Sequence, residues 1–429
     1  METSLPAVIQ SMLQPAFYPH PVTEAPIKLV QTHVSYVLLT GDWVYKVKKS
    51  VDFGFLDYST LDRRKMFCDR EIELNRRGVE GLYVETVPIY QNGNSHTLED
   101  GGEPVEYAVK MHQFPQEDLF SARFEAGELP RSRIVELAKR VADFHLSAPT
   151  DETIRTYGVA DQVKSALDQN FEQTQGYIGG PQTQTQYDET KAWTDAFFAD
   201  NGALLQSRVD NHWIRNGHGD LHLGNICLWQ DQVALFDCIE FNEPFRFVDT
   251  MFDIAYIVMD LEVAGREDLS KIFLNQYVEE TGDYEGLEIL PLYVSRQAYV
   301  RAKVTSFMLS DASVPEGDRR AASQSAAAYY KQAHAYTIAP EGKLMMMCGV
   351  SGSGKSTIAK KIADQYAQDQ GLKQKTIIIR SDAVRKHLGN VLLDEHAPDS
   401  LYTADMSAKT NQRLQDLGVD QVKRGYTEI

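Results

Sequence analysis

Hydrophobic and polar positions alternate along the first hundred residues in the manner of β-strands. Residues 27–49 alternate on both sides of a turn at Gly41-Asp42, which predicts paired strands over 34–40 and 43–49. Two further strands are predicted over 83–90 and 105–111. Between these pairs, residues 61–77 show helical spacing and predict a charged helix. The side chains expected on its buried side are Met66, Phe67, Ile72 and Leu74.

The pattern changes beyond Phe114-Pro115. Helical spacing dominates over 131–145, 188–207 and 250–336. A sheet-rich part followed by a helix-rich part predicts two lobes joined by a hinge near residues 112–115. We therefore expect an N-terminal nucleotide-binding lobe over residues 1–113 and a helical lobe over residues 114–338.

A third region is predicted over residues 339–429. It begins with a hydrophobic strand over 344–348, followed by a glycine-rich turn and a helix over 357–368. A second strand is expected over 376–379. This βαβ order is typical of a separate α/β unit.

Composition narrows the classes of partner. The 429 residues are 43% hydrophobic and 24% charged, which is ordinary for a globular chain of two or three domains. The formal net charge of −18 disfavours binding to nucleic acid or to anionic lipids. No apolar run approaches the ~20 residues that span a bilayer, and the four cysteines form no CxxC pair. We expect a cytoplasmic protein without nucleic-acid or membrane partners.

The first chemical motif is the segment 218–225, HGDLHLGN, which fits H-x-D-x-x-x-x-N. Phosphoryl transfer needs a carboxylate that orients the attacking hydroxyl and accepts its proton, and oxygen ligands for Mg²⁺. Asp220 can supply the first function, and Asn225 with Asp237 can supply the second.

Two short strands are expected over 226–229 and 233–236, around a turn at residues 230–231. Such a hairpin would place Asn225 and Asp237 nearly opposite each other, so that both could reach one metal ion. In the alternative interpretation, Asp220 and Asn225 only satisfy backbone amides and His218 is a buried, hydrogen-bonded histidine.

The strings HGDLHLGNI and LFDCIEF resemble the catalytic and metal-binding segments of aminoglycoside phosphotransferases, which are relatives of the protein kinases. The resemblance covers about residues 27–335. It implies a kinase-like α+β fold in two lobes, ATP and Mg²⁺ as cofactors, and transfer to a hydroxyl of a small molecule. It also implies that Asp220 is the catalytic base, that Asn225 and Asp237 bind the metal, and that His218 braces the loop.

A kinase-type lysine should lie on a strand and be held by a glutamate of the next helix. Lys46 and Lys48 lie on the same face of the strand over 43–48. Lys46 is closest to the family pattern and Lys48 remains the alternative. Glu71 is the expected partner, with Glu73 as its alternative. A solvated strand edge and helix face would explain the same charges without a site.

One departure from the protein kinases concerns the loop that covers the phosphates. Residues 32–36 (THVSY) stand where protein kinases have G-x-G-x-x-G. This argues against protein-kinase activity more than against phosphorylation of a small molecule, because the phosphotransferases that the chain resembles also lack the glycine pattern. Residues 240–253 carry further charges, which could order the catalytic loop or line an acidic acceptor pocket. For Asp249 we expect a helix N-terminal role.

The second motif, residues 349–356 (GVSGSGKS), matches G-x-x-x-x-G-K-[ST] in full and stands between a predicted strand and a predicted helix. In such a loop, backbone N–H groups and the helix dipole hold phosphate oxygens. Lys355 would reach the β- and γ-phosphates, and Ser356 would bind Mg²⁺. The nucleotide-binding residues expected here are Gly349, Ser351, Gly352, Ser353, Gly354, Lys355, Ser356 and Thr357.

The strand that follows ends in IRSD and resembles small P-loop kinases of the gluconate-kinase and zeta-toxin kind. That resemblance implies Asp382 as the base for an acceptor and Arg385 as a phosphate contact. A helix N-cap role for Ser381 or Asp382 is the alternative. Only 87 residues follow Gly342, and they show neither a strand ending in a Walker B-type aspartate nor an arginine-bearing lid. We therefore expect an incomplete P-loop unit that binds nucleotide.

The whole order resembles bacterial bifunctional aminoglycoside phosphotransferase/ATP-binding proteins. The prediction is an ATP- and Mg²⁺-dependent phosphotransferase with a second ATP site. Its acceptor would be a small hydroxylated metabolite or an aminoglycoside-like molecule. The alternative is a nucleotide-binding regulatory or sensor protein without transfer activity.

Overall fold

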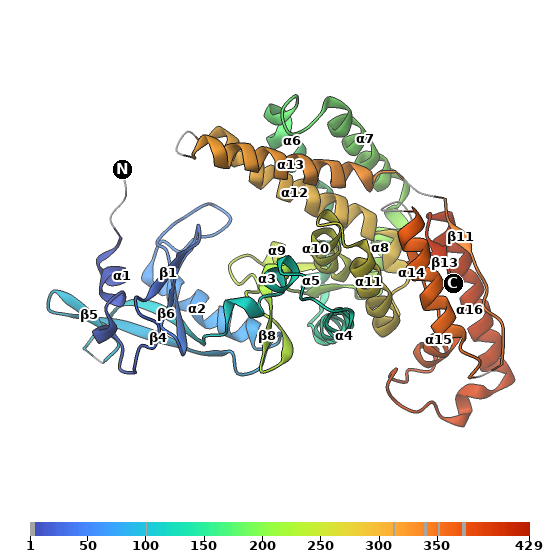
Figure 1. Ribbon diagram of the computed structural model, residues 1–429, viewed down its shortest axis with the longest axis horizontal. Helices are drawn as coiled ribbons and strands as arrows, with labels where there is room; N and C mark the ends of the chain where they lie inside the picture. The colour runs from blue at the N-terminus through green and yellow to red at the C-terminus, as the bar shows by residue number, and fades with distance from the viewer. Residues whose placement is uncertain (1–4, 100, 312–313, 339–340, 351, 371–374) are drawn as a thin grey trace. The chain divides into compact units, whose positions relative to one another are not determined.

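The computed structural model describes residues 5–99, 101–311, 314–338, 341–350, 352–370 and 375–429 (Figure 1). By packing, the chain divides into two compact units. The first comprises Met1–Leu129 and His218–Arg246, and the second comprises Pro130–Gly217 and Phe247–Ile429. The predicted domain ranges, with boundaries at 113/114 and 338/339, stay a prediction.

The first unit contains a six-stranded antiparallel sheet in the order β1-β2-β3-β6-β4-β5. Its strands are β1 (Lys28–Gln31), β2 (Ser35–Leu39), β3 (Trp43–Lys48), β4 (Tyr83–Asn92), β5 (Ser95–Thr97) and β6 (Pro104–His112). Gly41 makes the β2–β3 turn with φ +106°, a conformation that favours glycine. The predicted strands are confirmed, and the short β5 was not predicted.

Alternation along β3 divides its side chains between two faces of the sheet. Tyr45 and Val47 pack against a cluster that includes Ile9 and Met12 of helix α1 (Ala7–Met12). Val44 packs on the opposite face, against residues of helix α2 (Leu61–Asn75). The even-numbered residues of β3, including both lysines, therefore face α2.

Helix α2 confirms the predicted helix, with a different buried face. Thr60 caps its N-terminus by accepting a hydrogen bond from the Arg63 N–H. Met66 is 52% exposed, so the prediction that it is buried is wrong. The helix turns a partly polar face inward, because its buried charges find partners. The buried residues are Arg64, Cys68, Glu71, Ile72, Leu74 and Asn75.

The rest of the first unit includes a hairpin of β8 (Ile226–Trp229) and β9 (Gln232–Leu235). Gln230 and Asp231 make its turn with φ +52° and +62°, the backbone of a two-residue hairpin loop. Short helices complete this unit: η1 (Pro15–Phe17), η2 (Gln116–Asp118), α3 (Phe120–Glu125), η5 (Leu223–Asn225) and α9 (Glu243–Arg246).

The second unit is mainly helical, as predicted for the middle of the chain. Its helices before residue 339 are α4 (Arg131–Ser147), α5 (Glu152–Arg155), η3 (Thr156–Gly158), α6 (Ala160–Thr174), η4 (Gln175–Tyr177), α7 (Gln184–Asp200), α8 (Gly202–Asp210), α10 (Thr250–Val263), α11 (Glu267–Thr281), η6 (Glu285–Glu288), α12 (Leu290–Ser310) and α13 (Glu316–Ala335). Strands β7 (Ile214–Asn216) and β10 (Phe247–Asp249) pair antiparallel. Asp249 caps α10 by accepting from the Met251 N–H at 2.9 Å, which confirms its predicted N-terminal role.

The C-terminal part of this unit is an α/β segment with a parallel sheet in the order β11-β13-β12. Its strands are β11 (Lys343–Leu344), β12 (Thr376–Ile377) and β13 (Thr427–Glu428), and its helices are α14 (Lys355–Gln370), α15 (Ser381–Leu388), η8 (Asp399–Tyr402) and α16 (Ala404–Lys423). Strands β11 and β12 are shorter than predicted, because the ordered ladder spans two residues in each. Strand β13, which lies between them, was not predicted.

A side chain of α11 occupies the free edge of β12. Asn275 donates from Nδ2 to the Thr376 carbonyl at 2.8 Å and accepts from the Ile378 N–H at 2.7 Å. One turn later, Glu279 pairs with Arg380 at 2.6 Å. The P-loop segment is thus anchored on α11 within the second unit.

The fold class is the expected one. It combines a protein-kinase-like antiparallel sheet with its helix and the hairpin of β8 and β9, a helical unit, and a C-terminal P-loop-type α/β segment. A search of the described helices finds none that is long and apolar enough to cross a membrane.

Candidate nucleotide and phosphoryl-transfer sites

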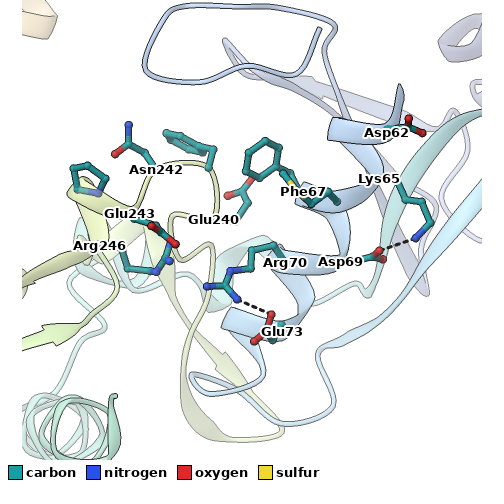
Figure 2. A pocket seen from close by; sticks show the side chains of 13 residues that line it. Asp62, Lys65, Phe67, Asp69, Arg70, Glu73, Glu240, Asn242, Glu243 and Arg246 are labelled. Atoms are coloured by element: carbon teal, nitrogen blue, oxygen red, sulfur yellow. Dashed lines mark hydrogen bonds and ion pairs between the residues drawn. The ribbon is translucent and has the colours of Figure 1, made fainter. Parts of the chain in front are cut away.

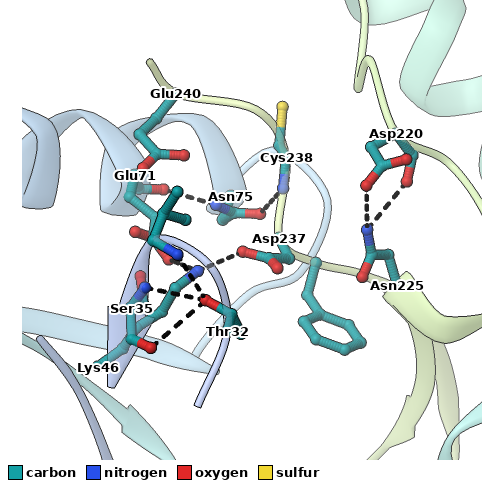
Figure 3. A network of polar contacts seen from close by, with 12 residues as sticks. Thr32, Ser35, Lys46, Glu71, Asn75, Asp220, Asn225, Asp237, Cys238 and Glu240 are labelled. Carbon is teal, nitrogen blue, oxygen red and sulfur yellow. Dashed lines mark hydrogen bonds and ion pairs between the residues drawn. The ribbon is translucent and has the colours of Figure 1, made fainter. Parts of the chain in front are cut away.

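Lys46 is the centre of a polar network in the first unit (Figure 3). Its Nζ lies 2.8 Å from Glu71 Oε1 and 2.5 Å from Asp237 Oδ1. These residues come from strand β3, helix α2 and the segment after β9, so the fold joins three distant parts of the chain. Sequence analysis predicted all three, and the structure brings them together.

The charges of this network stabilise one another. Burial opposes the charged form of Lys46, but Asp237 and Glu71 outweigh that effect and raise its pKa well above the ordinary value. Burial likewise opposes ionisation of Asp237 and of Glu71, and the neighbouring ammonium of Lys46 lowers the pKa of both carboxyls. The three groups are therefore charged at neutral pH.

Lys48 has a different set of partners. Its Nζ lies 2.7 Å from Glu71 Oε2 and also contacts the Glu240 carboxylate and, at 3.4 Å, the Tyr58 hydroxyl. The side chain is fully buried. Glu73, the alternative partner for the lysines, instead pairs with Arg70 at 2.8 Å and is 67% exposed. Glu71, rather than Glu73, thus holds both lysines.

The backbone at Asp237 is held in a left-handed conformation, with φ +61°. Its N–H donates to the Tyr83 hydroxyl at 3.1 Å. The next N–H, that of Cys238, donates to Asn75 Oδ1 at 2.9 Å, and Asn75 Nδ2 donates to the Glu71 carbonyl at 2.8 Å. Tyr83 and Asn75 were missed by sequence analysis, because nothing in their local sequence marks a long-range contact.

The catalytic segment follows the predicted hairpin geometry. Strands β8 and β9 pair from Ile226↔Leu235 to Trp229↔Gln232, and the Phe236 N–H donates to the Asn225 carbonyl at 3.1 Å. Asn225 and the residue before Asp237 are thus paired, which confirms the predicted hairpin. The positions of both proposed metal ligands are fixed by one two-stranded ladder.

Within this segment Asp220 contacts both Asn225 and His218. Asn225 Nδ2 donates to the Asp220 carbonyl at 3.0 Å and lies 3.4 Å from Asp220 Oδ2. His218 is 1% exposed; its Nε2 donates to the Phe236 carbonyl at 2.9 Å, and its Nδ1 accepts from the Asp220 N–H at 3.4 Å. The contacts of His218 agree with bracing of the loop and equally with a buried, hydrogen-bonded histidine.

The donor set of this segment fits Mg²⁺. The Asn225 amide nitrogen is engaged with Asp220, so its amide oxygen is the end that can ligate a cation. Asp237 adds a carboxylate that is 41% exposed. Hard oxygen ligands of this kind, completed by nucleotide phosphates and water, suit Mg²⁺. The described residues contain no group of three or more His, Cys, Asp or Glu that could hold a metal.

His222 also contacts Asp220, although the motif gave His222 no role. Its Nε2 lies 3.4 Å from Asp220 Oδ2, and its Nδ1 accepts from the Gly224 N–H at 3.0 Å. The proton of the neutral ring is therefore on Nε2, facing the Asp220 carboxylate.

The P-loop is an exposed turn that leads into α14. Gly352 and Gly354 have φ +77° and +83°, a conformation that glycine adopts without strain. Lys355 Nζ donates to the carbonyls of Gly349 and Val350 at 2.7 and 2.8 Å. Gly349, Ser353, Ser356 and Thr357 also lie in this loop and the first turn of α14, while Ser351 falls outside the described residues.

Asp382 lies in the first turn of α15, with its side chain 46% exposed. The N-cap position of this helix is Arg380, and no side chain caps it, so the N-cap alternative for Ser381 or Asp382 is wrong. Arg385 stacks over the Tyr402 ring at 4.9 Å. Asp382 therefore remains available to solvent near the end of β12.

A cavity of about 1010 Å³ in the first unit lies between α2 and residues 240–246 (Figure 2). Its lining residues are Asp62, Lys65, Met66, Phe67, Asp69, Arg70, Glu73, Glu240, Phe241, Asn242, Glu243, Pro244 and Arg246. Residues 240–244 and Arg246 line this cavity, as expected for residues that follow Asp237. The lining carries five carboxylates and three cations, so it is acidic overall, and its role as an acceptor pocket stays a prediction.

Comparisons with known proteins bear on both parts of the chain. Residues 344–429 match the family model AAA_33, described as an AAA domain. Among solved structures, a choline/ethanolamine kinase family protein from Mesorhizobium loti is 10% identical, with a TM-score of 0.43, over 77% of this chain and 98% of that chain. The GDP complex of wild-type aminoglycoside 2'-phosphotransferase-IIIa is 14% identical, with a TM-score of 0.42, over 77% and 99%. Such low scores say nothing about the substrate.

The relatives by sequence are mycobacterial. Uncharacterized protein Rv2004c of Mycobacterium tuberculosis and uncharacterized protein Mb2027c of Mycobacterium bovis are each 30% identical over 370 residues. The match covers 86% of this chain and 70% of each relative. The chain therefore belongs to the family of the mycobacterial protein Rv2004c.

Proposed function

We propose that this protein is an ATP- and Mg²⁺-dependent phosphotransferase that acts on a hydroxyl of a small molecule, with a second ATP-binding site at the P-loop. The observation that carries the proposal is that Lys46 Nζ lies 2.8 Å from a carboxylate oxygen of Glu71 and 2.5 Å from one of Asp237. A lysine on a strand, a helix glutamate and a carboxylate after a catalytic hairpin are the parts that a kinase-type centre needs.

Asp220 is the proposed catalytic base. Its side chain is 39% exposed, so an acceptor hydroxyl can reach it. The carboxylate would orient that hydroxyl toward the γ-phosphate and take its proton as the new O–P bond forms. Asn225 and His222 hold the carboxylate from two sides, and His218 holds its backbone.

Asn225 and Asp237 are the proposed metal ligands in the kinase-like centre. Bound Mg²⁺ would offset the charge of the nucleotide phosphates. Lys46 would exchange its contact with Asp237 for a contact with phosphate oxygens, while Glu71 keeps the ammonium in place. The transferred group would thus be positioned by charges that the fold already holds together.

The P-loop is the proposed second nucleotide site. Backbone N–H groups of Gly352, Ser353 and Gly354, with the N-terminus of α14, would surround phosphate oxygens. Lys355 would leave its carbonyl partners for the β- and γ-phosphates, and Ser356 would bind Mg²⁺. Asp382 is the proposed contact for an acceptor at this site.

The acceptor class and the compartment complete the proposal. The acceptor is a small hydroxylated metabolite or an aminoglycoside-like molecule, because no residue described above selects more narrowly. A cytoplasmic location is supported by four cysteines that are all free thiols. The net charge of −18 supports the absence of nucleic-acid partners.

A phosphorylation screen tests the proposal. Full-length protein, its Asp220→Ala variant and its Lys355→Ala variant are incubated with ATP, Mg²⁺ and a panel of hydroxylated metabolites and aminoglycosides. We expect phosphorylation of at least one acceptor, a loss of about 10²–10⁴-fold in Asp220→Ala, and retained transfer in Lys355→Ala. ATP binding without transfer to any acceptor, with altered affinity for a partner, would instead support the regulatory alternative.

A further inference from the structure

The ion pairs around Glu71 have an open end and a buried end. At the open end, the side chains of Lys46 and Asp237 are 14% and 41% exposed. At the buried end, Lys48 and Glu71 are 0% exposed and Glu240 is 6% exposed. Each carboxylate oxygen of Glu71 serves one lysine, Oε1 accepting from Lys46 and Oε2 from Lys48. The proposed mechanism uses the open end and gives the buried end no role.

We propose that Lys48, Tyr58 and Glu240 form a positioning latch, which fixes Glu71 and the metal-binding segment 237–240 and thereby sets the Mg²⁺ requirement of the kinase-like site. The inference rests on the proposed function of that site. Lys48 is then a positioning residue and not the phosphate-binding lysine.

The latch matters when Lys46 changes its partner at the open end. With a metal at Asp237, the contact of Asp237 with Lys46 would open, and Lys46 would turn toward phosphate while it keeps Glu71. Glu71 is fully buried, and a buried carboxylate without a cation is strongly unfavourable. Lys48 keeps Glu71 paired at 2.7 Å whichever partner Lys46 takes. Lys48 therefore holds Glu71, and through Glu71 the ammonium of Lys46, while Lys46 changes its other partner.

The latch also limits where Asp237 can lie. Glu240 follows it by three residues, a length of chain that spans at most about 10 Å. Lys48 Nζ and the Tyr58 hydroxyl both donate to Glu240 Oε1, and Asn75 holds the intervening Cys238 N–H. The segment is thus fastened to β3, to Tyr58 and to α2.

The test measures Mg²⁺-dependent binding of a fluorescent ATP analogue to the full chain. All proteins carry Lys355→Ala, so that binding reports the kinase-like site. Lys48→Met and the isosteric Glu240→Gln are expected to raise the Mg²⁺ concentration at half-maximal binding about tenfold or more, as loss of residues that orient metal ligands does elsewhere. Tyr58→Phe, which leaves Lys48 on Glu240, is expected to raise it less.

Glu106→Gln is the matched control for Glu240→Gln. Glu106 is also a buried carboxylate of the first unit, and it accepts from Arg64 Nε at 2.8 and 3.0 Å. This control is expected to lower the melting temperature and to leave the Mg²⁺ requirement unchanged. If Lys48→Met does not fold, Glu240→Gln and Tyr58→Phe give the answer.

Three outcomes separate the latch from the proposed function. A lowered melting temperature with an unchanged Mg²⁺ requirement in Glu240→Gln and Tyr58→Phe would reduce the latch to a structural role. Binding lost in Lys48→Met and kept in Lys46→Met would make Lys48 the phosphate-binding lysine and overturn the latch alone. Binding that does not depend on Mg²⁺ or on Asp237 would overturn the proposed function and the latch together.

Discussion

The two proposed phosphate-binding lysines are held in opposite ways. Lys46 stands on a strand, 14% exposed, between carboxylates that come from 25 and 191 residues away in the chain. Lys355 stands at the start of α14 and donates to carbonyls five and six residues before it. One lysine is positioned by the packing of a whole unit, and the other by its own loop. Loss of the first should disturb the fold, and loss of the second should disturb binding alone.

The largest expected effect concerns nucleotide stoichiometry. We expect the full chain to bind two ATP molecules, and Lys46→Met and Lys355→Met to bind one each, with affinity at the altered site reduced by about 100-fold or more. Isothermal titration with a non-hydrolysable ATP analogue and Mg²⁺ measures this. The double variant is the control and should bind none. A single site lost in both single variants would show that the two lysines serve one nucleotide.

A second comparison concerns stability. Lys46→Met removes a cation from the buried Glu71 and should lower the free energy of unfolding by about 3 kcal/mol, since one broken ion pair is largely buried. Lys355→Met removes contacts made at the surface and should change it by less than about 0.5 kcal/mol. Urea unfolding in the absence of nucleotide measures both. Equal losses would contradict the distinction between packing and local support.

The smallest expected effect is the pH dependence of the difference in the free energy of unfolding between wild type and Lys46→Met. Glu71 and Asp237 have pKa values below their ordinary values of 4.5 and 3.8, so the stability they contribute is present at neutral pH and falls as the pH drops through the folded-state values. Lys46 has a raised pKa, so its contribution persists at every pH below the ordinary value of 10.5. The stability gap between wild type and Lys46→Met should thus stay constant from pH 5 to 9 and narrow in acid, below the ordinary pKa values of the carboxyls, about 4.

Urea midpoints for the two proteins across this pH range measure the gap. Lys355→Met serves as the control, because its difference from wild type should remain flat throughout. A gap that widens in acid would contradict the ion-pair account.

The features that could be predicted from sequence are those that a local segment determines, as at Lys355, and not those that depend on the packing of a whole unit. The glycine-rich turn, Lys355 and the helix after it form one continuous string, so local pattern sufficed. The hairpin after Asn225 was also local, because a turn between two apolar runs sets the register of β8 and β9. Lys46 and Glu71 were reached through a family resemblance, because no local rule connects a strand with a helix 25 residues later.

The features that were not predicted from sequence depend on tertiary contacts. Met66 follows the helical apolar pattern and yet faces solvent, because α2 buries charged residues that find partners only in the folded unit. Tyr83 and Asn75 act through single long-range hydrogen bonds to the backbone of residues 237 and 238. Strand β13 spans only two residues, which is too short to leave a periodic signal in its own sequence. Its partners in β11 and β12 lie 84 and 51 residues earlier in the chain.

The two hydrogen bonds from Asn275 to the edge of β12 affect where a further strand can join this sheet. Sheet edges invite pairing with other strands, because their N–H and C=O groups are unpaired. The amide of Asn275 takes the Thr376 carbonyl and the Ile378 N–H, as a neighbouring strand would. Any additional strand, whether from this polypeptide or from a second molecule, is therefore shut out at β12 and has to add to the small parallel sheet at β11.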